Sequence, residues 1–231
     1  MNNSERFISA FNKIEKYLDD VIKAGDRFTS FSSSVKRAAE KNIIVRRYKD
    51  DLLEISELRN AIVHERTDPE YLIAEPHDSV VELLEKIYEE LTEPKKVYPL
   101  YARDVTTFKL NDTLKDLLSV VKEASYSYFP IYNHTEFQGL VTENGITHWL
   151  ASKDKNILLN EVFIKEILPF EEGKDNYAFL SSEASIYEAE EIFRNHINQN
   201  TRFDVILITE NGKPTEQLLG MITAWDIIEL P

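Results

Sequence analysis

The stretch GLVTENGI at residues 139–146 decides the fold, because GMITAWDI at residues 220–227 repeats its pattern without a gap. Each copy begins with glycine and two apolar residues, which is typical of a strand, and then passes through threonine into a helical pattern. Threonine is a preferred residue at the start of a helix. The C-terminal part of the chain therefore contains an internal duplication.

The duplication extends upstream of these two stretches. An amphipathic helical pattern over residues 113–124 matches residues 185–196, and the apolar run 129–132 matches 203–206. The predicted order of elements is strand, helix, strand, strand, helix, and this order occurs twice. The second copy is longer because residues 211–217 extend its hairpin, at a tip where an insertion leaves the repeat intact.

This repeat, with an aspartate three residues after the threonine in its second copy, resembles a tandem pair of CBS domains, a Bateman module. The resemblance covers about residues 98–231. It implies that each copy folds as a small β-α-β-β-α unit and that the two copies associate pseudo-symmetrically. It also implies an adenine nucleotide in the cleft between the copies, and the sequence does not separate AMP, ADP, ATP and cyclic dinucleotides.

The expected ligand-binding residues lie in the second copy. Thr223 stands where the strand enters the helix, so its hydroxyl lies beside free N–H groups and the positive end of the helix dipole, which attract phosphate. Asp226, one turn further, can accept hydrogen bonds from two ribose hydroxyls. By position, Phe179, Val205 and Ile206 are the candidates for holding the base. The sequence does not choose among four cations for the phosphate: Arg103, Lys109, Arg202 and Lys213.

A second interpretation of the same residues needs no ligand. Thr223 and Asp226 also have the spacing of a capping box, in which the carboxylate only supports the start of the helix. In the first copy, Gly145 stands at the position of Asp226, with only Glu143 and Asn144 nearby. We therefore expect at most one well-formed nucleotide site in the chain.

The N-terminal part of the chain has a different pattern, with apolar residues at helical spacing from residue 7 to residue 91. Gly25 and the serines of 30–34 interrupt this pattern and offer a new helix start, and Asp68-Pro69 ends a later helix. Three or four helices in a small bundle are predicted, with residues 71–76 as an extended connector. Prolines and lysines between residues 92 and 99 place a domain boundary near residue 95.

Within this bundle, Arg59 and His64 form an Arg-x4-His motif with Asn60 directly after the arginine. The motif resembles that of the HEPN superfamily, many members of which are metal-independent ribonucleases that pair two motifs across a dimer. His64 titrates near neutrality and Arg59 can stabilise a phosphorane, so the residue types suit RNA cleavage. On one unbroken helix, however, the two side chains lie roughly 140° apart. The alternative is that both residues decorate a helix end.

Composition excludes several classes of protein. The 231 residues include no cysteine, and the six glycines form neither a phosphate-binding loop nor a nucleophile elbow. The five histidines lack metal-binding spacing, and no apolar run reaches the ~18 residues of a membrane span. The net charge of −14 disfavours broad nucleic-acid binding, and only residues 36–49, which carry six basic side chains and one acidic one, favour RNA. We expect no metal, no membrane and a cytoplasmic location.

These observations predict an α+β protein with a helical, HEPN-like domain over residues 1–94 and CBS repeats over 95–165 and 166–231. The leading hypothesis is a cytoplasmic regulatory protein whose CBS pair senses an adenine nucleotide. Its helical domain would mediate homodimerisation or contact a protein partner. The alternatives are a metal-independent ribonuclease regulated by the CBS pair, with RNA as substrate, and a ligand-free dimerisation scaffold.

Overall fold

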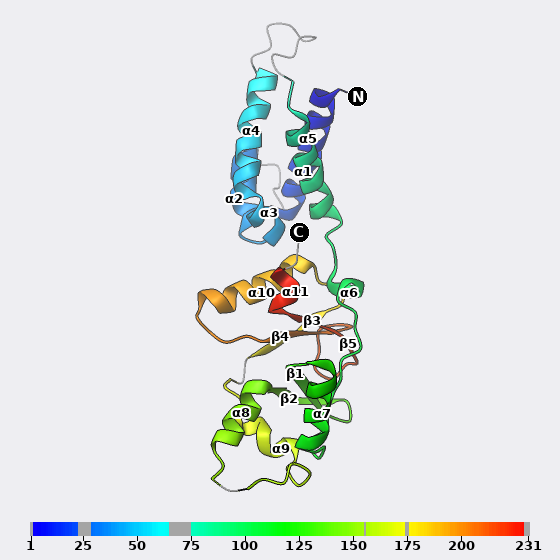
Figure 1. Ribbon diagram of the computed structural model, residues 1–231. Helices are drawn as coiled ribbons and strands as arrows, with labels where there is room; N and C mark the ends of the chain where they lie inside the picture. Colours follow the sequence, from blue (N-terminus) through cyan, green and yellow to red (C-terminus); the bar gives the residue numbers. More distant parts are fainter. Residues whose placement is uncertain (1, 23–28, 65–74, 155, 174–175, 229–231) are drawn as a thin grey trace. The chain divides into compact units, whose positions relative to one another are not determined.

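The computed structural model describes residues 2–22, 29–64, 75–154, 156–173 and 176–228 of the chain, and Figure 1 labels its elements. The chain divides into two compact units, Met1–Lys95 and Lys96–Pro231. The first unit is helical and the second combines helices with two small sheets. The predicted α+β class is confirmed.

The N-terminal unit consists of α1 (Asn3–Ile22), α2 (Phe31–Ala39), α3 (Ile43–Arg47), α4 (Lys49–His64) and α5 (Asp78–Thr92). The described residues thus form five helices where three or four were predicted. The additional helix is α3, which begins because the Asn42 side chain accepts hydrogen bonds from the N–H groups of Ile44 and Val45. The expectations for Gly25, Asp68-Pro69 and residues 71–74 lie outside the described residues.

The core of this unit is built on the apolar face of α1. Phe7, Phe11 and Ile14 are fully buried, and α1 packs against α2 and α5. The ring of Phe11 stacks on that of Phe31 from α2, with 4.3 Å between ring centroids. The helical spacing of apolar residues in the sequence therefore corresponds to the buried faces of the bundle.

The first repeat of the C-terminal unit contains α7 (Leu114–Ala124), β1 (Tyr128–Asn133), β2 (Glu136–Thr142) and α8 (Glu143–Ala151). The two strands pair antiparallel. The predicted first strand is reduced to a single parallel bridge between Phe108 and Ile131. Pro130 explains the correction, because continuing this parallel pairing by two residues needs a hydrogen bond from the N–H that proline lacks.

The second repeat has every element of the predicted order: β3 (Tyr177–Ser181), α10 (Ile186–Asn198), β4 (Val205–Thr209), β5 (Leu218–Thr223) and α11 (Ala224–Ile228). In its sheet β4 is central, with β3 parallel and β5 antiparallel to it. The remaining elements are α6 (Val97–Leu100), α9 (Ile164–Ile167) and a short 3-10 helix, η1 (Leu168–Phe170).

Strand pairing gives the true equivalence of the two copies. Tyr128 pairs with Thr142, and Val205 pairs with Thr223, so Tyr128 corresponds to Val205. The match of residues 129–132 with 203–206 is therefore wrong by three positions. The cause is a longer connection from α10 to β4, in which Phe203 resembles a strand residue but packs edge-on against Phe193 of α10.

The two small sheets pack against each other through a shared apolar cluster. Leu140 of β2 and Val205 and Leu207 of β4 are its buried centre. At its margin the Phe137 ring meets that of Phe179 edge to face, with 5.1 Å between centroids. This contact holds the two repeats together and positions the polar ends of their strands.

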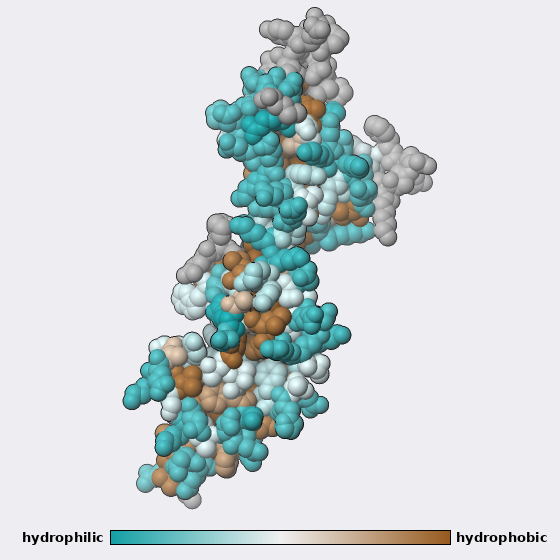
Figure 2. Space-filling model, turned by 90° about the vertical axis from the view of Figure 1, so that its right-hand side faces the viewer, coloured by the Kyte–Doolittle hydropathy of each residue, from teal (hydrophilic) through white to brown (hydrophobic). Residues whose placement is uncertain are grey.

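The surface of the C-terminal unit also carries apolar residues. Figure 2 shows brown hydrophobic surface among teal on this unit. Trp225 and Ile228 of α11 are 75% and 71% exposed. Among the described residues, no helix is long and apolar enough to cross a membrane.

Gly220 provides a test of how the segment before α7 reaches the second repeat. A Cβ atom at Gly220 would lie 2.2 Å from the carbonyl oxygen of Tyr101, whereas one at Gly173 would meet nothing within 4 Å. We expect Gly220→Ala to lower the free energy of unfolding by roughly 1–3 kcal/mol, because backbone must move. Gly173→Ala should change it by less than about 0.5 kcal/mol. Denaturation followed by tryptophan fluorescence measures this unit alone, and equal effects of the two variants would contradict the close approach.

Candidate functional site

A cavity of about 400 Å³ opens in the C-terminal unit between segments of both repeats. This volume lies within the range of small-molecule sites in proteins. The lining residues come from the segment before α7, the connection from α7 into β1, and the junction of β5 with α11: Arg103, Asp104, Val105, Thr106, Ser125, Tyr126, Ser127, Tyr128, Met221, Thr223 and Trp225.

One wall of the cavity depends on the close approach of the chain to Gly220. Ala102 forms an isolated bridge with Gly220, which the absence of a side chain there allows. The next residue, Arg103, thereby reaches the start of α11, where its Nη2 lies 2.6 Å from Oδ1 of Asp226. Arg103 is the only one of the four candidate phosphate cations that lines this cavity.

Thr223 and Asp226 are brought together at the same wall. Oδ2 of Asp226 accepts hydrogen bonds from the Thr223 N–H at 2.7 Å and from its hydroxyl at 2.8 Å. Thr223 lines the cavity, whereas Asp226 is not among the lining residues. The carboxylate half of the capping box is thus present, and one of the roughly four acceptor positions of the carboxylate is free.

The electrostatics of Asp226 follow from these contacts. Burial alone would raise the pKa of its carboxyl group. The Arg103 guanidinium and the N–H and hydroxyl of Thr223 outweigh burial, and the pKa lies below its usual value. Asp226 therefore stays ionised and holds both neighbours in place at neutral pH.

Aromatic side chains also line the cavity. Tyr126 lies in the connection before β1, Tyr128 is the first residue of β1, and the exposed Trp225 lies on α11. Aromatic faces of this kind stack on nucleobases. None of the three was predicted from the sequence, although alternating serines and tyrosines in a connecting segment are an available signal for Tyr126 and Tyr128.

The three residues proposed to hold the base lie elsewhere. Val205 and Ile206 are fully buried, and neither lines the cavity. Phe179 belongs to the apolar cluster between the sheets, where it packs on Phe137. Their role in holding a base therefore stays a prediction.

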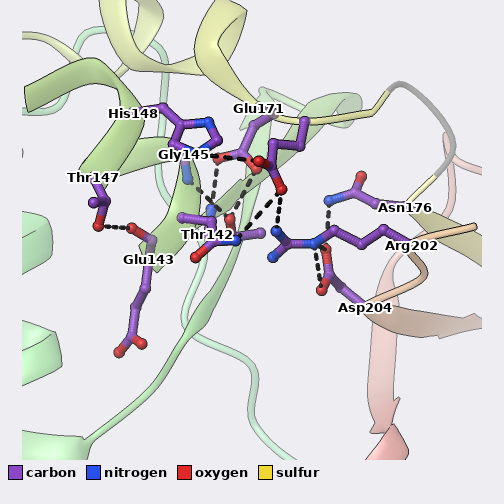
Figure 3. Close-up of polar contacts among 11 residues, drawn as sticks. Thr142, Glu143, Gly145, Thr147, His148, Glu171, Asn176, Arg202 and Asp204 are labelled. Atoms are coloured by element: carbon purple, nitrogen blue, oxygen red, sulfur yellow. Dashed lines mark hydrogen bonds and ion pairs between the residues drawn. The ribbon is translucent and has the colours of Figure 1, made fainter. Parts of the chain in front are cut away.

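The counterpart of this site in the first repeat is built differently (Figure 3). Thr142 is buried at the end of β2, and its hydroxyl accepts a hydrogen bond from the Gly145 N–H. The carboxylate that faces Thr142 belongs to Glu171, which follows η1 and is not part of α8, the helix that begins after Thr142. Burial raises the pKa of Glu171, while its hydrogen bonds from Thr142 oppose the rise.

The predicted ribonuclease residues lie on α4 of the helical unit. The Arg59 guanidinium lies over the ring of Phe11, 5.5 Å from its centroid, and donates a hydrogen bond to the side chain of Asn60. Asn60 is exposed. The side chain of His64 lies outside the described part of the chain, so the ribonuclease motif stays a prediction.

Comparisons with known proteins identify the C-terminal unit. The CBS domain model matches residues 97–152 and 170–231, which together make up just over half of the chain. The chain therefore belongs to the CBS domain family and carries two copies of the domain. The search of curated protein sequences gave no match.

Solved CBS structures resemble the chain in fold at low sequence identity. A conserved CBS domain protein of Thermoplasma acidophilum is 14% identical over 60% of this chain and 70% of its own, with a TM-score of 0.44. The CBS domain pair of protein MJ0100, in complex with 5′-methylthioadenosine and S-adenosyl-L-methionine, is 15% identical over 58% and 94%, with a TM-score of 0.43. The CBS domain of a bacterial CNNM/CorC family Mg²⁺ transporter, in complex with ATP, is 15% identical over 58% and 85%, with a TM-score of 0.42.

The lowered pKa of Asp226 predicts an acid-dependent contribution to stability. A carboxyl group with a lowered pKa in the folded state stabilises that state fully above its unfolded pKa of about 3.9. This stabilisation is lost as the pH falls through the lower folded pKa. Asp226→Asn should cost about 1 kcal/mol at pH 7, a value that allows for the partial exposure of Arg103.

The measurement is the free energy of unfolding of wild type and variant between pH 7 and pH 3, with Asp154→Asn as the control at an exposed position. The difference between wild type and Asp226→Asn should narrow below pH 4, while the control stays near wild type throughout. A difference that does not depend on pH would contradict the assigned role of the carboxylate.

Proposed function

We propose that the CBS pair of this protein is a regulatory module that senses an adenine nucleotide in the cavity beside Thr223. The single observation that carries the proposal is the combination of groups on the cavity walls. The lining brings together a hydroxyl at a helix start, a guanidinium and aromatic side chains. Phosphate, ribose and base each find a suitable partner there.

Each polar group has a distinct task in this proposal. The Arg103 guanidinium supplies positive charge for a phosphate. The Thr223 hydroxyl donates its one proton to Asp226, so its oxygen is an acceptor for a ribose hydroxyl. Asp226 does not line the cavity, and it orients both groups through its hydrogen bonds. Tyr126 and Trp225, which are 47% and 75% exposed, are accessible to a flat base.

The charge of the cavity favours a ligand with few negative charges. Arg103 is the only basic residue among the lining residues, and it is ion-paired with Asp226 while Asp104 stands beside it. The cavity therefore suits a ligand with one or two phosphates better than a ligand with three. AMP and ADP are therefore expected to bind more tightly than ATP.

Nucleotide binding would act on the rest of the chain by shifting a conformational equilibrium. A ligand that touches segments of both repeats favours the arrangement in which its contacts are complete. We propose that the helical unit responds to this change as the part that dimerises or contacts a protein partner. The division of the chain into two compact units suits this arrangement, since each can change its partners without unfolding the other.

The test is titration calorimetry of the full chain with AMP, ADP, ATP and cyclic di-AMP. Thr223→Val should weaken the binding of AMP by about fivefold to tenfold, because one hydrogen bond to the ligand is lost. Thr92→Val, at an exposed position of the helical unit, is the matched control and should bind as wild type does. Trp225 at the rim supplies a second signal, since its emission should change on binding and Trp225→Phe should abolish that change.

Two outcomes would contradict the proposal in different ways. Equal affinity of Thr223→Val and wild type would place the nucleotide elsewhere. Absence of heat with every nucleotide, together with an unchanged melting temperature, would leave a ligand-free scaffold, because a ligand that binds only the folded state must raise its stability.

A further inference from the structure

Glu171 occupies the space that a side chain at Gly145 would take. A Cβ atom at Gly145 would lie 1.7 Å from Oε1 of Glu171. The two carboxylate oxygens of Glu171 accept hydrogen bonds from the Thr142 N–H at 2.8 Å and from the Thr142 hydroxyl at 2.9 Å. Asp226 makes the same two bonds to Thr223 in the second repeat. The first repeat therefore receives its carboxylate from the segment between the repeats.

The neighbouring Glu172 binds both repeats. Its Oε2 accepts a hydrogen bond from Nη1 of Arg202 at 2.7 Å, and its Oε1 lies 3.1 Å from Nε2 of His148 on α8. Arg202 also pairs with Asp204, which is buried and accepts a hydrogen bond from Asn176 at 2.8 Å. Figure 3 shows Arg202 reaching from Asp204 toward the group around Glu171. Two adjacent glutamates thus connect the start of α8 with the start of β4.

At both ends of this connection, strand pairing joins the connected residues to residues that line the cavity. Thr142 pairs with Tyr128, which lines one wall. Asp204 precedes Val205, which pairs with Thr223, a lining residue from the second repeat. The pKa of Tyr128 is raised by burial and then by the Asp204 carboxylate, and Arg202 acts in the opposite direction, so these charges lie close to the phenol.

We infer that Glu171 and Glu172 form a clasp that fills the first-repeat counterpart of the Thr223 site and sets the spacing of the cavity walls that carry Tyr128 and Thr223. Burying the Glu171 carboxylate is unfavourable unless it is hydrogen-bonded, and Thr142 provides both bonds. The clasp leaves the second repeat as the place for a ligand. Its effect on nucleotide affinity rests on the proposed function, whereas its effect on wall spacing does not.

The first test asks whether Gly145→Ala raises or lowers the melting temperature. Alanine is a better helix former than glycine, so Gly145→Ala by itself favours α8. In the presence of Glu171, however, the new methyl group displaces the carboxylate from Thr142. Gly145→Ala should therefore lower the melting temperature of the wild type by a few degrees, and raise that of Glu171→Ala by a similar amount.

Tryptophan emission reports the thermal unfolding of the C-terminal unit, because both tryptophans, Trp149 and Trp225, belong to this unit. Glu171→Gln keeps an acceptor for the Thr142 N–H and should melt close to wild type. A rise, or an equal fall, caused by Gly145→Ala in both backgrounds would overturn the clasp.

The second test measures the spacing of the walls. The chain has no cysteine, so spin labels can be placed at Glu123→Cys and Ile228→Cys, two exposed positions on α7 and α11. Replacing Glu171 and Glu172 by alanine should broaden the distance distribution and lengthen its mean. Replacing the exposed Asp154 and Glu161 by alanine removes the same charge and should leave the distribution unchanged. An unchanged distribution in the clasp variant would overturn the inference.

The same variants separate this inference from the proposed function. In unlabelled protein, at a temperature where both variants are folded, loss of the clasp should weaken AMP binding about fivefold relative to the control variant. Equal AMP affinity in the clasp and control variants would overturn the positioning role. Absence of AMP binding in the wild type would contradict the proposed function, and the spin-label distances would still decide the clasp.

Discussion

The C-terminal unit depends on burial of the apolar faces of two small sheets against each other. A sheet of two or three strands is marginally stable alone, since it leaves one apolar face in water. Leu140, Val205 and Leu207 remove that face from water in both repeats at once. Because this contact fixes the strands, it also fixes the polar residues at the strand ends, where the cavity and the clasp lie.

At each of these strand ends, a threonine presents its N–H and hydroxyl to a carboxylate. The second repeat meets this requirement locally, through Asp226, and the carboxylate is balanced by Arg103. The first repeat meets it through Glu171, from a different segment, and the adjacent Glu172 is balanced by Arg202. One repeat thus keeps a threonine that faces a cavity, while the other uses its threonine to attach the intervening segment. The two repeats are therefore structurally asymmetric at this position.

The accuracy of sequence-based inference differed from element to element. The gapless match of residues 139–146 with 220–227 located both strand-to-helix junctions, and the match of 113–124 with 185–196 located α7 and α10. These features depend on neighbours a few residues apart, so local sequence is sufficient to predict them. The match of 129–132 with 203–206 failed because an apolar residue in a connection, Phe203, is locally indistinguishable from a strand residue.

For the candidate site, the sequence predicted five ligand-binding residues, of which Thr223 lines the cavity and Asp226 contacts Thr223, whereas Phe179, Val205 and Ile206 lie outside the lining. It also noted Gly145 as a departure from the pattern without a means of finding the carboxylate that replaces it. The two contacts that shape the site join residues far apart in the chain: Arg103 and Asp226 are separated by 123 positions, and Thr142 and Glu171 by 29. The order of elements, the helix starts and the glycines that permit close approach are written in the sequence. Only tertiary packing decided which segments meet at the contacts Arg103–Asp226 and Thr142–Glu171. These contacts join groups that come together only when the two sheets have packed against each other.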